Sequence, residues 1–184
     1  MNIRESWIDL LHRAATGTKK TRTLLTPIGV VIFGAFTALF VLAALWIDGL
    51  LNLPGLLPHG ARLPVSVPLM AAGVAITAWS GYHFLKVKGT PVPFNPPSEV
   101  VTTGPYRYAR NPMLSGVFLF LFGLGFAFDS ISLVLFFTPL FILANVWELQ
   151  QIEEPELVKR FGETYLEYRR RTPMFIPGPD RSRS

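Results

Sequence analysis

Two adjacent carboxylates are the strongest chemical signal in the chain: Glu153 and Glu154 stand directly before Pro155. Neighbouring carboxylates repel each other unless a cation or a hydrogen-bond donor lies between them. Arg107 and Arg110 are candidates for that cation, and a bound ligand is the alternative. Because proline disfavours a helical conformation in the residue before it, we also expect the chain to bend at Glu154. The glutamate pair therefore marks a candidate site for binding or catalysis.

A second polar segment, GPYRYARNPMLSG at residues 104–116, lies directly before an apolar stretch. Its leading Gly-Pro pair predicts a turn, Pro112 suits the first position of a helix, and Asn111 suits the N-cap of that helix. A helix start presents free N–H groups and the positive end of the helix dipole, which suit a carboxylate or a phosphate. Gly116, one turn into the helix, lets a neighbouring helix or a ligand approach the backbone closely.

The elements that would position these residues are apolar helices. Residues 27–47 and 65–85 carry no charged side chain, and about 20 residues at about 1.5 Å each cross a hydrocarbon core of about 30 Å. A third apolar region is interrupted by Asp129, which is costly to bury at mid-depth in a membrane. We therefore expect a tight hairpin of two short spans at 113–128 and 131–149, and an all-α bundle of four transmembrane spans.

Composition agrees with a membrane protein. Half of the 184 residues are hydrophobic, 16% are charged, and the mean hydropathy is +0.38. The net charge of +5 is interpreted as a membrane feature and not as a nucleic-acid-binding one, because all 17 lysines and arginines except Arg62 fall on one side of the four-span layout. By the positive-inside rule that side, with both termini, is expected to be cytoplasmic. Cysteine is absent and the three histidines lie far apart, so no metal site is expected.

The chain is expected to form a single integral membrane domain over residues 1–184. Residues 1–26 show no cleavable signal, and an amphipathic helix at residues 3–15 is expected to lie on the membrane surface. The first two spans occupy residues 27–85. The remaining half, residues 86–184, begins with a stiff proline-rich strap and carries the candidate site.

A second amphipathic helix is expected after the glutamate pair. Leu157, Phe161, Tyr165 and Tyr168 recur at helical spacing, with charged side chains on the opposite face. This helix would lie either on the bilayer or over the mouth of the site. The arginine run at 169–171 is expected to contact anionic lipid headgroups.

The order of these segments carries a resemblance. GTPVPFNPP, TTGPYRYARNPMLSG, an apolar hairpin and EEPELVKRFGETYLEYRRRTPMFIP resemble the bacterial branch of the isoprenylcysteine carboxyl methyltransferase family, which is related to the membrane phospholipid methyltransferases. The resemblance covers about residues 86–177, roughly half of the chain. It implies an enzyme that uses S-adenosylmethionine, held between the end of the last span, the loop before the hairpin and the C-terminal helix.

The family's motif is Arg-His-Pro-x-Tyr-x-Gly followed by a glutamate pair. Arg110, Pro112 and Gly116 match it, and so does the pair described above. Asn111 replaces the histidine and Leu114 replaces the tyrosine. Asparagine still donates a hydrogen bond whereas leucine does not, so these two positions could mark a different acceptor or a weakened activity.

The resemblance implies a set of cofactor contacts, with Arg110, Glu153 and Glu154 also assigned to catalysis. Arg110 and the helix start at Asn111 would bind the carboxylate of the cofactor. Glu153 or Glu154 would bind its ribose hydroxyls or its amino group, and aromatic rings would pack against its adenine. The full set is Tyr106, Arg110, Asn111, Pro112, Leu114, Gly116, Glu148, Glu153, Glu154, Phe161 and Tyr165.

The methyl acceptor is expected to be lipophilic and to enter sideways from the bilayer: a prenylcysteine carboxylate, a phospholipid amine or another hydrophobic small molecule. The candidate segments contain no histidine, so no general base is evident there. A carboxylate acceptor needs no base. An amine or a thiol must arrive deprotonated or use a carboxylate or tyrosine of the protein.

Two other functions fit part of the pattern. An NADPH-dependent membrane reductase of the sterol-reductase kind would have a similar C-terminal half, although the glutamate pair favours methyl transfer and such reductases have additional spans. A non-catalytic membrane protein that keeps the fold for binding or scaffolding is the other, and Asn111 and Leu114 are the reason to consider it.

Overall fold

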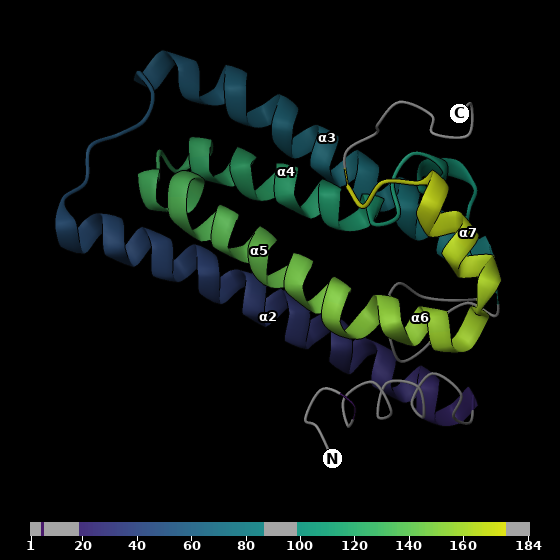
Figure 1. Cartoon of the computed structure of the whole chain (residues 1–184). Coiled ribbons are helices and arrows are strands. Elements are labelled where there is room, and N and C mark those ends of the chain that lie inside the picture. Colours follow the sequence, from purple (N-terminus) through teal and green to yellow (C-terminus); the bar gives the residue numbers. More distant parts are fainter. Residues whose placement is uncertain (1–4, 6–18, 87–98, 176–184) are drawn as a thin grey trace. The chain divides into compact units, whose positions relative to one another are not determined.

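The computed structural model describes Glu5, residues 19–86 and residues 99–175. These residues are mainly helical, and no strand occurs among them (Figure 1). In chain order the helical elements are α2 (Lys19–Leu51), α3 (His59–Lys86), η1 (Gly104–Arg107), α4 (Pro112–Ala127), η2 (Leu133–Phe137), α5 (Thr138–Glu148), η3 (Leu149–Glu153), α6 (Glu154–Phe161) and α7 (Glu163–Arg171). The all-α class is confirmed for this part of the chain. The predicted helix at 3–15, apart from Glu5, and most of the proline-rich strap lie outside the described residues.

The first two predicted spans are helices of spanning length. The apolar part of α2, Pro27–Leu51, has 25 residues, and its most apolar 18-residue stretch has a mean hydropathy of 2.6. α3 has 28 residues, and its most apolar 18-residue stretch has a mean hydropathy of 1.5. At about 1.5 Å per residue both exceed a hydrocarbon core of about 30 Å. Both helices are longer than the charge-free stretches from which they were predicted.

The predicted hairpin is present, with arms of unequal length. α4 has 16 residues, and a turn at Asp129, whose φ is 55°, leads into the second arm (Figure 1). The second arm is helical from Leu133 to Phe161, 29 residues, and therefore continues well past the predicted end at residue 149. Within the described chain three helices are long and apolar enough to cross a membrane, and α4 is shorter than that length.

The predicted bend at Glu154 is wrong, because the helix continues through Pro155. Ahead of it, η3 is a π-helical turn, in which the N–H of Glu154 bonds to the carbonyl of Leu149, five residues back. Pro155 then falls in the first turn of α6, where a missing N–H costs little. The chain breaks instead at Gly162, whose φ of 57° favours glycine. The predicted single C-terminal amphipathic helix is therefore two helices, α6 and α7.

The chain forms two compact units, each assembled from separate stretches of sequence. Unit 1 contains Met1–Ile32, Trp79–Pro112 and Val146–Ser184, and unit 2 contains Phe33–Ala78 and Met113–Asn145. Unit 1 thus combines the loop before α4 with the segments that follow the last span. The expectation of a single membrane domain stays a prediction.

Unit 2 is built around an aromatic cluster. Phe141 on α5 is fully buried. Its ring centroid lies 5.5 to 6.2 Å from those of Phe33, Phe36, Phe40 and Phe118, and most of these pairs are edge-on. Edge-to-face pairs at this spacing stabilise packing beyond simple burial.

Small residues let α3 and α4 approach closely within unit 2. A Cβ atom on Gly116 would lie 2.6 Å from the carbonyl oxygen of Gly73, and a Cβ on Gly73 would lie 2.6 Å from the carbonyl oxygen of Gly116. Glycine and other small residues are enriched where membrane helices pack tightly. Of the two partners that the sequence allows for Gly116, the structure therefore places the neighbouring helix there.

The Asp129 turn is held by contacts from the loop between α2 and α3 and from the first turn of α3. The Asp129 carboxylate accepts hydrogen bonds from the N–H groups of Leu56 at 2.8 Å and Leu57 at 3.0 Å, and lies 2.5 Å from the guanidinium of Arg62. The hydrogen bond from Leu57, foremost, and the charge of Arg62 hold the pKa of Asp129 below its usual value, although desolvation opposes them. We call this group the Asp129 clasp.

Candidate active site

The central feature of unit 1 is an ion pair between the two predicted segments. A guanidinium N–H of Arg110 donates to Glu154, and the two side chains are only 11% and 9% exposed. The second oxygen of Glu154 lies 3.6 Å from Arg169 on α7. Arg107, the other candidate cation, is exposed. The structure thus brings Arg110 and Glu154 together and adds Arg169 as a second cation.

The backbone before α4 is bonded to the segment that follows α7. The N–H of Arg110 donates to the carbonyl of Pro173 at 2.8 Å, and the N–H of Asn111 donates to the carbonyl of Met174 at 3.0 Å. These two amides are therefore bonded within the chain. The segment fixes the backbone from which the Arg110 side chain extends.

Three tyrosines surround the ion pair. Tyr106, in η1, is buried and packs edge-on against Phe84 with ring centroids 5.1 Å apart. The Tyr168 hydroxyl donates to the backbone carbonyl of Tyr106 at 2.7 Å, and the ring of Tyr168 lies 6.2 Å from that of Tyr165, which is buried. The hydrogen bond from Tyr168 to Tyr106 therefore links α7 to η1, the element just before Arg110.

Each of these phenols stays neutral near pH 7. Burial is the main cause that raises the pKa of Tyr106, of Tyr165 and of Tyr168 above the ordinary value for tyrosine. Nearby carboxylates, Glu153 for Tyr106 and Glu154 for Tyr165, raise it further, whereas Arg110 lowers the pKa of Tyr165. A phenol in this state donates a hydrogen bond but does not act as a base. Tyrosine is therefore a poor choice for deprotonating an acceptor here.

A π-helical turn leads from the last span into the site. Glu148 is the last residue of α5, and η3 follows it up to Glu153. Such turns change the faces on which later side chains project and are frequent at functional sites. Here the turn precedes Glu154, whose side chain faces Arg110. Glu148 and Glu153 lie at its two ends in the same unit.

The remaining predicted residues are divided between the units. Phe161 ends α6, and the guanidinium of Arg160 lies 4.5 Å from the centre of its ring. Pro112 is buried at the start of α4. Leu114 and Gly116 belong to unit 2, and Gly116 packs against α3. The structure therefore gathers most of the predicted set in unit 1 and leaves Leu114 and Gly116 in the other unit.

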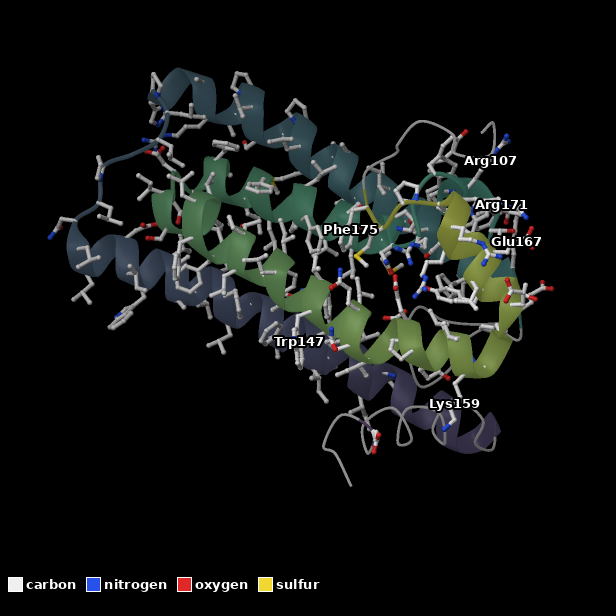
Figure 2. All side chains as sticks on the ribbon, in the orientation of Figure 1. Arg107, Trp147, Lys159, Glu167, Arg171 and Phe175 are labelled. Carbon is white, nitrogen blue, oxygen red and sulfur yellow. The ribbon has the colours of Figure 1, made fainter. Side chains whose placement is uncertain are left out.

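Other side chains of unit 1 are exposed. Trp147 on α5 is 62% exposed, and on α7 the exposed side chains of Glu167 and Arg171 pair with each other (Figure 2). Glu163 and Arg170 pair at 2.6 Å in the same way. Exposed pairs of this kind contribute little to stability. Part of the arginine run is thus neutralised within the helix.

Sequence reasoning missed three contributors to this unit. Arg169 was assigned to lipid headgroups, although it faces Glu154. The Pro173–Met174 segment gave no sign of its bonds to the loop. His83, at the end of α3, lies against Gly104, whose φ is 61°. None of these partners is close in sequence, so no local pattern could have revealed them.

The fold and the site define a class of protein, an all-α membrane protein with a buried arginine–glutamate pair. The family model for phospholipid methyltransferases (PEMT) matches residues 61–164, more than half of the chain. The chain therefore belongs to the phospholipid methyltransferase family, a family of membrane methyltransferases, as the resemblance in the sequence predicted. It is an integral membrane protein.

Similarity to a curated protein covers a smaller part. The chain is 35% identical over 80 residues to a nickel-cobalt-cadmium resistance protein, NccN, of Alcaligenes xylosoxydans xylosoxydans. The matched part is 44% of this chain and 37% of that relative. Among the residues that the structure describes, no three histidine, cysteine, aspartate or glutamate side chains gather as a metal site would require.

Proposed function

We propose that this chain is an S-adenosylmethionine-dependent methyltransferase that acts at the membrane surface on a lipophilic acceptor. Membership of the family supports methyl transfer, and the apolar helices support a reaction at a bilayer. The observation that carries the proposal is the buried pair of Arg110 and Glu154. Arg110 Nε is also buried and has no hydrogen-bond partner within the described chain.

The side chains present fit this cofactor. Its amino-acid carboxylate needs N–H donors, and its amino group and ribose hydroxyls need acceptors. Arg110 Nε–H supplies a spare donor, and Glu153 and Glu154 supply acceptors. When bound, the cofactor supplies a methyl group on a positively charged sulfur, which is already activated for transfer. The protein then has mainly to position the reactants and to exclude water.

Arg169 explains how Arg110 can serve both Glu154 and a ligand. If Arg110 turned toward a carboxylate and nothing replaced it, Glu154 would remain as a buried unpaired charge, which is strongly unfavourable. Arg169 already lies 3.6 Å from the second oxygen of Glu154 and is 44% exposed, so it has room to move closer. We assign Arg110 to the cofactor carboxylate and Arg169 to the compensation of Glu154.

The other assignments follow the predicted set. Asn111 lies beside Arg110 at the helix start, and Tyr106, Phe161 and Tyr165 pack the adenine ring. The acceptor is a prenylcysteine carboxylate, a phospholipid amine or another hydrophobic small molecule that enters from the bilayer. The distribution of lysine and arginine supports cytoplasmic termini. The resemblance to the bacterial branch of the family is the reason to place the protein in a prokaryotic inner membrane.

Binding of S-adenosylhomocysteine to detergent-purified protein tests the site. Glu154→Gln keeps the shape of the side chain and removes its charge, and we expect affinity to fall at least about tenfold, which corresponds to about 1.4 kcal/mol. Glu163→Gln on α7 is the matched control, because Glu163 is exposed and pairs only with Arg170 among the described residues. Equal affinities for the wild type and Glu154→Gln would contradict the assignment of Glu154.

The same preparation separates the alternatives. A thermal shift with S-adenosylhomocysteine and none with NADPH is expected, whereas the reverse would favour a reductase. Membranes incubated with methyl-labelled S-adenosylmethionine are expected to yield a labelled lipid-soluble product. Cofactor binding without any labelled product would favour a non-catalytic binding protein.

A further inference from the structure

The Asp129 clasp belongs to an end of unit 2 in which every charged side chain is bonded within the protein. We call this region, residues 48–63 and 127–133, the clasp end. Its charged residues are Asp48, Arg62 and Asp129. Arg62 pairs with Asp129, and Asp48 accepts hydrogen bonds from a serine hydroxyl and, at 3.1 Å, from a backbone N–H of the Asp129 turn. No charge of the clasp end therefore depends on water for a partner.

The loop between α2 and α3 also leaves few backbone donors open. Two of its residues are prolines, which have no N–H. The N–H of Leu53 bonds to the carbonyl of Asp48 at 3.1 Å, and the N–H groups of Leu56 and Leu57 bond to the Asp129 carboxylate. Polar backbone groups without a partner are costly where water is scarce. The loop is thus bonded as a segment in contact with a membrane has to be.

The exposed side chains of the clasp end are mainly apolar. The large hydrophobic ones are 37% to 67% exposed, and they are Leu50, Leu51, Leu53, Leu63 and Phe128. Asn52 and His59 are the exposed side chains there that have polar groups. Contiguous exposed apolar side chains mark contact with a membrane or with another protein.

α4 is too short to carry its two ends to opposite surfaces of a bilayer. Its 16 residues span about 24 Å at about 1.5 Å each, whereas the hydrocarbon core is about 30 Å thick. The clasp end follows α4, and the loop that carries Arg110 precedes it. One of these polar regions therefore lies below the lipid headgroups, or the bilayer becomes thinner around α4.

The charges on the site side of α4 are exposed, unlike those of the clasp end. Arg107, five residues before α4, is exposed. In the same unit α7 carries the exposed pair of Glu167 and Arg171. Exposed charges are unfavourable in hydrocarbon, so this end of α4 is the one that meets water at the membrane surface.

We propose that the clasp end lies within the bilayer, with the Asp129 clasp below the lipid headgroups and with phospholipid covering its exposed leucines and Phe128. The loop between α2 and α3 then lies at the level of the headgroups, where Asn52 and His59 find polar partners. The internal bonds of Asp48 and Asp129 explain how two carboxylates are tolerated there. This inference goes beyond the proposed function, because it concerns the other end of α4 and needs no cofactor.

The depth of the clasp end has a consequence for the site. α4 begins directly after Asn111, and its far end is fixed to the first two spans by the Asp129 clasp. A helix anchored at one end holds its other end at a set depth. The loop that carries Arg110 is thereby kept at the membrane surface, within reach of both water and lipid.

Reaction of single cysteines tests the placement. The chain has no cysteine, so each variant reports on one position. We reconstitute Phe128→Cys in phosphatidylcholine vesicles with a charged maleimide on both sides of the bilayer. It should react at least about tenfold more slowly than Glu167→Cys, because hydrocarbon excludes a charged reagent. Both positions are exposed, and an unchanged Tm confirms that each variant is folded. Equal rates would place the clasp end in water and overturn the inference.

Bilayer thickness gives a second measurement. Lipids with shorter acyl chains form a thinner hydrocarbon core, so the reaction of Phe128→Cys should become faster in them while that of Glu167→Cys stays the same. Leu53→Cys, in the loop at the headgroups, should react at an intermediate rate. A rate for Phe128→Cys that is slow and independent of acyl-chain length would count against coverage by lipid.

Quenching by brominated phospholipids identifies what covers the clasp end. A fluorophore attached in detergent to Phe128→Cys should be quenched after reconstitution, because it touches the acyl chains. Protection from the maleimide without quenching would overturn the assignment to phospholipid. If that protection also disappeared as the ratio of lipid to protein was raised, a second copy of the chain would be the partner instead.

These measurements are independent of methyl transfer. A protein that binds no S-adenosylhomocysteine but shows slow, thickness-dependent reaction of Phe128→Cys would overturn the proposed function and leave this inference intact. The reverse result would overturn the inference alone.

Discussion

Units 1 and 2 each hold a carboxylate against an arginine, and the surroundings of the two carboxylates differ. Asp129 in unit 2 also accepts hydrogen bonds from two backbone N–H groups of the loop before α3, so its oxygens are satisfied by fixed donors as well as by Arg62. Glu154 in unit 1 is contacted by Arg110 and Arg169, and Arg110 keeps a buried N–H without a partner within the described chain. A carboxylate satisfied by backbone donors has a structural role, whereas a pair of side chains with a spare donor is suited to a ligand.

Removal of Arg110 should give the largest effect. Arg110→Ala leaves Glu154 buried without its nearest cation, which costs about 3 to 5 kcal/mol when one partner of a buried pair is removed. We expect S-adenosylhomocysteine binding to be lost and the Tm in detergent to fall. Arg107→Ala, at the exposed arginine three residues earlier, is the control. Cofactor binding that survives in Arg110→Ala would break the contrast between the two carboxylates.

Substitution of Asp129 should affect stability alone. Asp129→Asn weakens the contact with Arg62, so we expect a lower Tm and unchanged affinity for S-adenosylhomocysteine. Because its pKa is depressed in the folded protein, the stabilisation by Asp129 is present above its ordinary pKa of 3.8 and is lost as the pH falls through the lower folded value. The Tm of the wild type should therefore drop below about pH 4. If the Tm of Asp129→Asn falls with decreasing pH as much as the Tm of the wild type, the Asp129 clasp is not the cause of the pH dependence.

Loss of one hydroxyl in unit 1 should have a smaller effect. Tyr168→Phe removes the hydrogen bond to the carbonyl of Tyr106, which contributes about 1 kcal/mol. We expect a small decrease in Tm and a several-fold weaker affinity for S-adenosylhomocysteine, because η1 is held less firmly to α7. Calorimetric titration of the two proteins measures both quantities. An affinity identical to that of the wild type would mean that Tyr168 has no part in positioning the loop.

The exposed pairs on α7 should have the smallest effect. Glu167→Gln removes the partner of Arg171, and exposed pairs contribute about 0 to 1 kcal/mol. We expect Tm and cofactor affinity within error of the wild type. A large loss of affinity would extend the site to the exposed charges of α7 and weaken the distinction between buried and exposed charges.

The sequence predicts what depends on local composition. The charge-free stretches of spanning length lie in α2 and α3, and Asp129 lies in a turn. Both were predictable because hydrophobic length and turn-forming residues are properties of short stretches of sequence. Pro155 does not bend the chain at Glu154 as the sequence predicted, because the π-helical turn ahead of it changes the hydrogen-bond register. Gly162, with its positive φ, ended the helix instead.

The site was predictable only in part, because most of its contacts join residues that are far apart in the sequence. The attraction of unlike charges predicted that an arginine of the loop pairs with the glutamates, and Arg110 does pair with Glu154. Which arginine of the run at 169–171 faces Glu154 depends on where α7 begins, and that depends on Gly162. His83 is 21 residues before Gly104 in the sequence, so only the fold reveals their contact.

The bonds from Pro173 and Met174 to the loop before α4 matter for protein production. Because their carbonyls hold the amides of Arg110 and Asn111, a truncation that removes them would release the backbone that carries Arg110. Such a shortened protein could insert and fold its spans yet fail to bind a cofactor. Expression variants should therefore retain the chain through Phe175, and an affinity tag belongs beyond it.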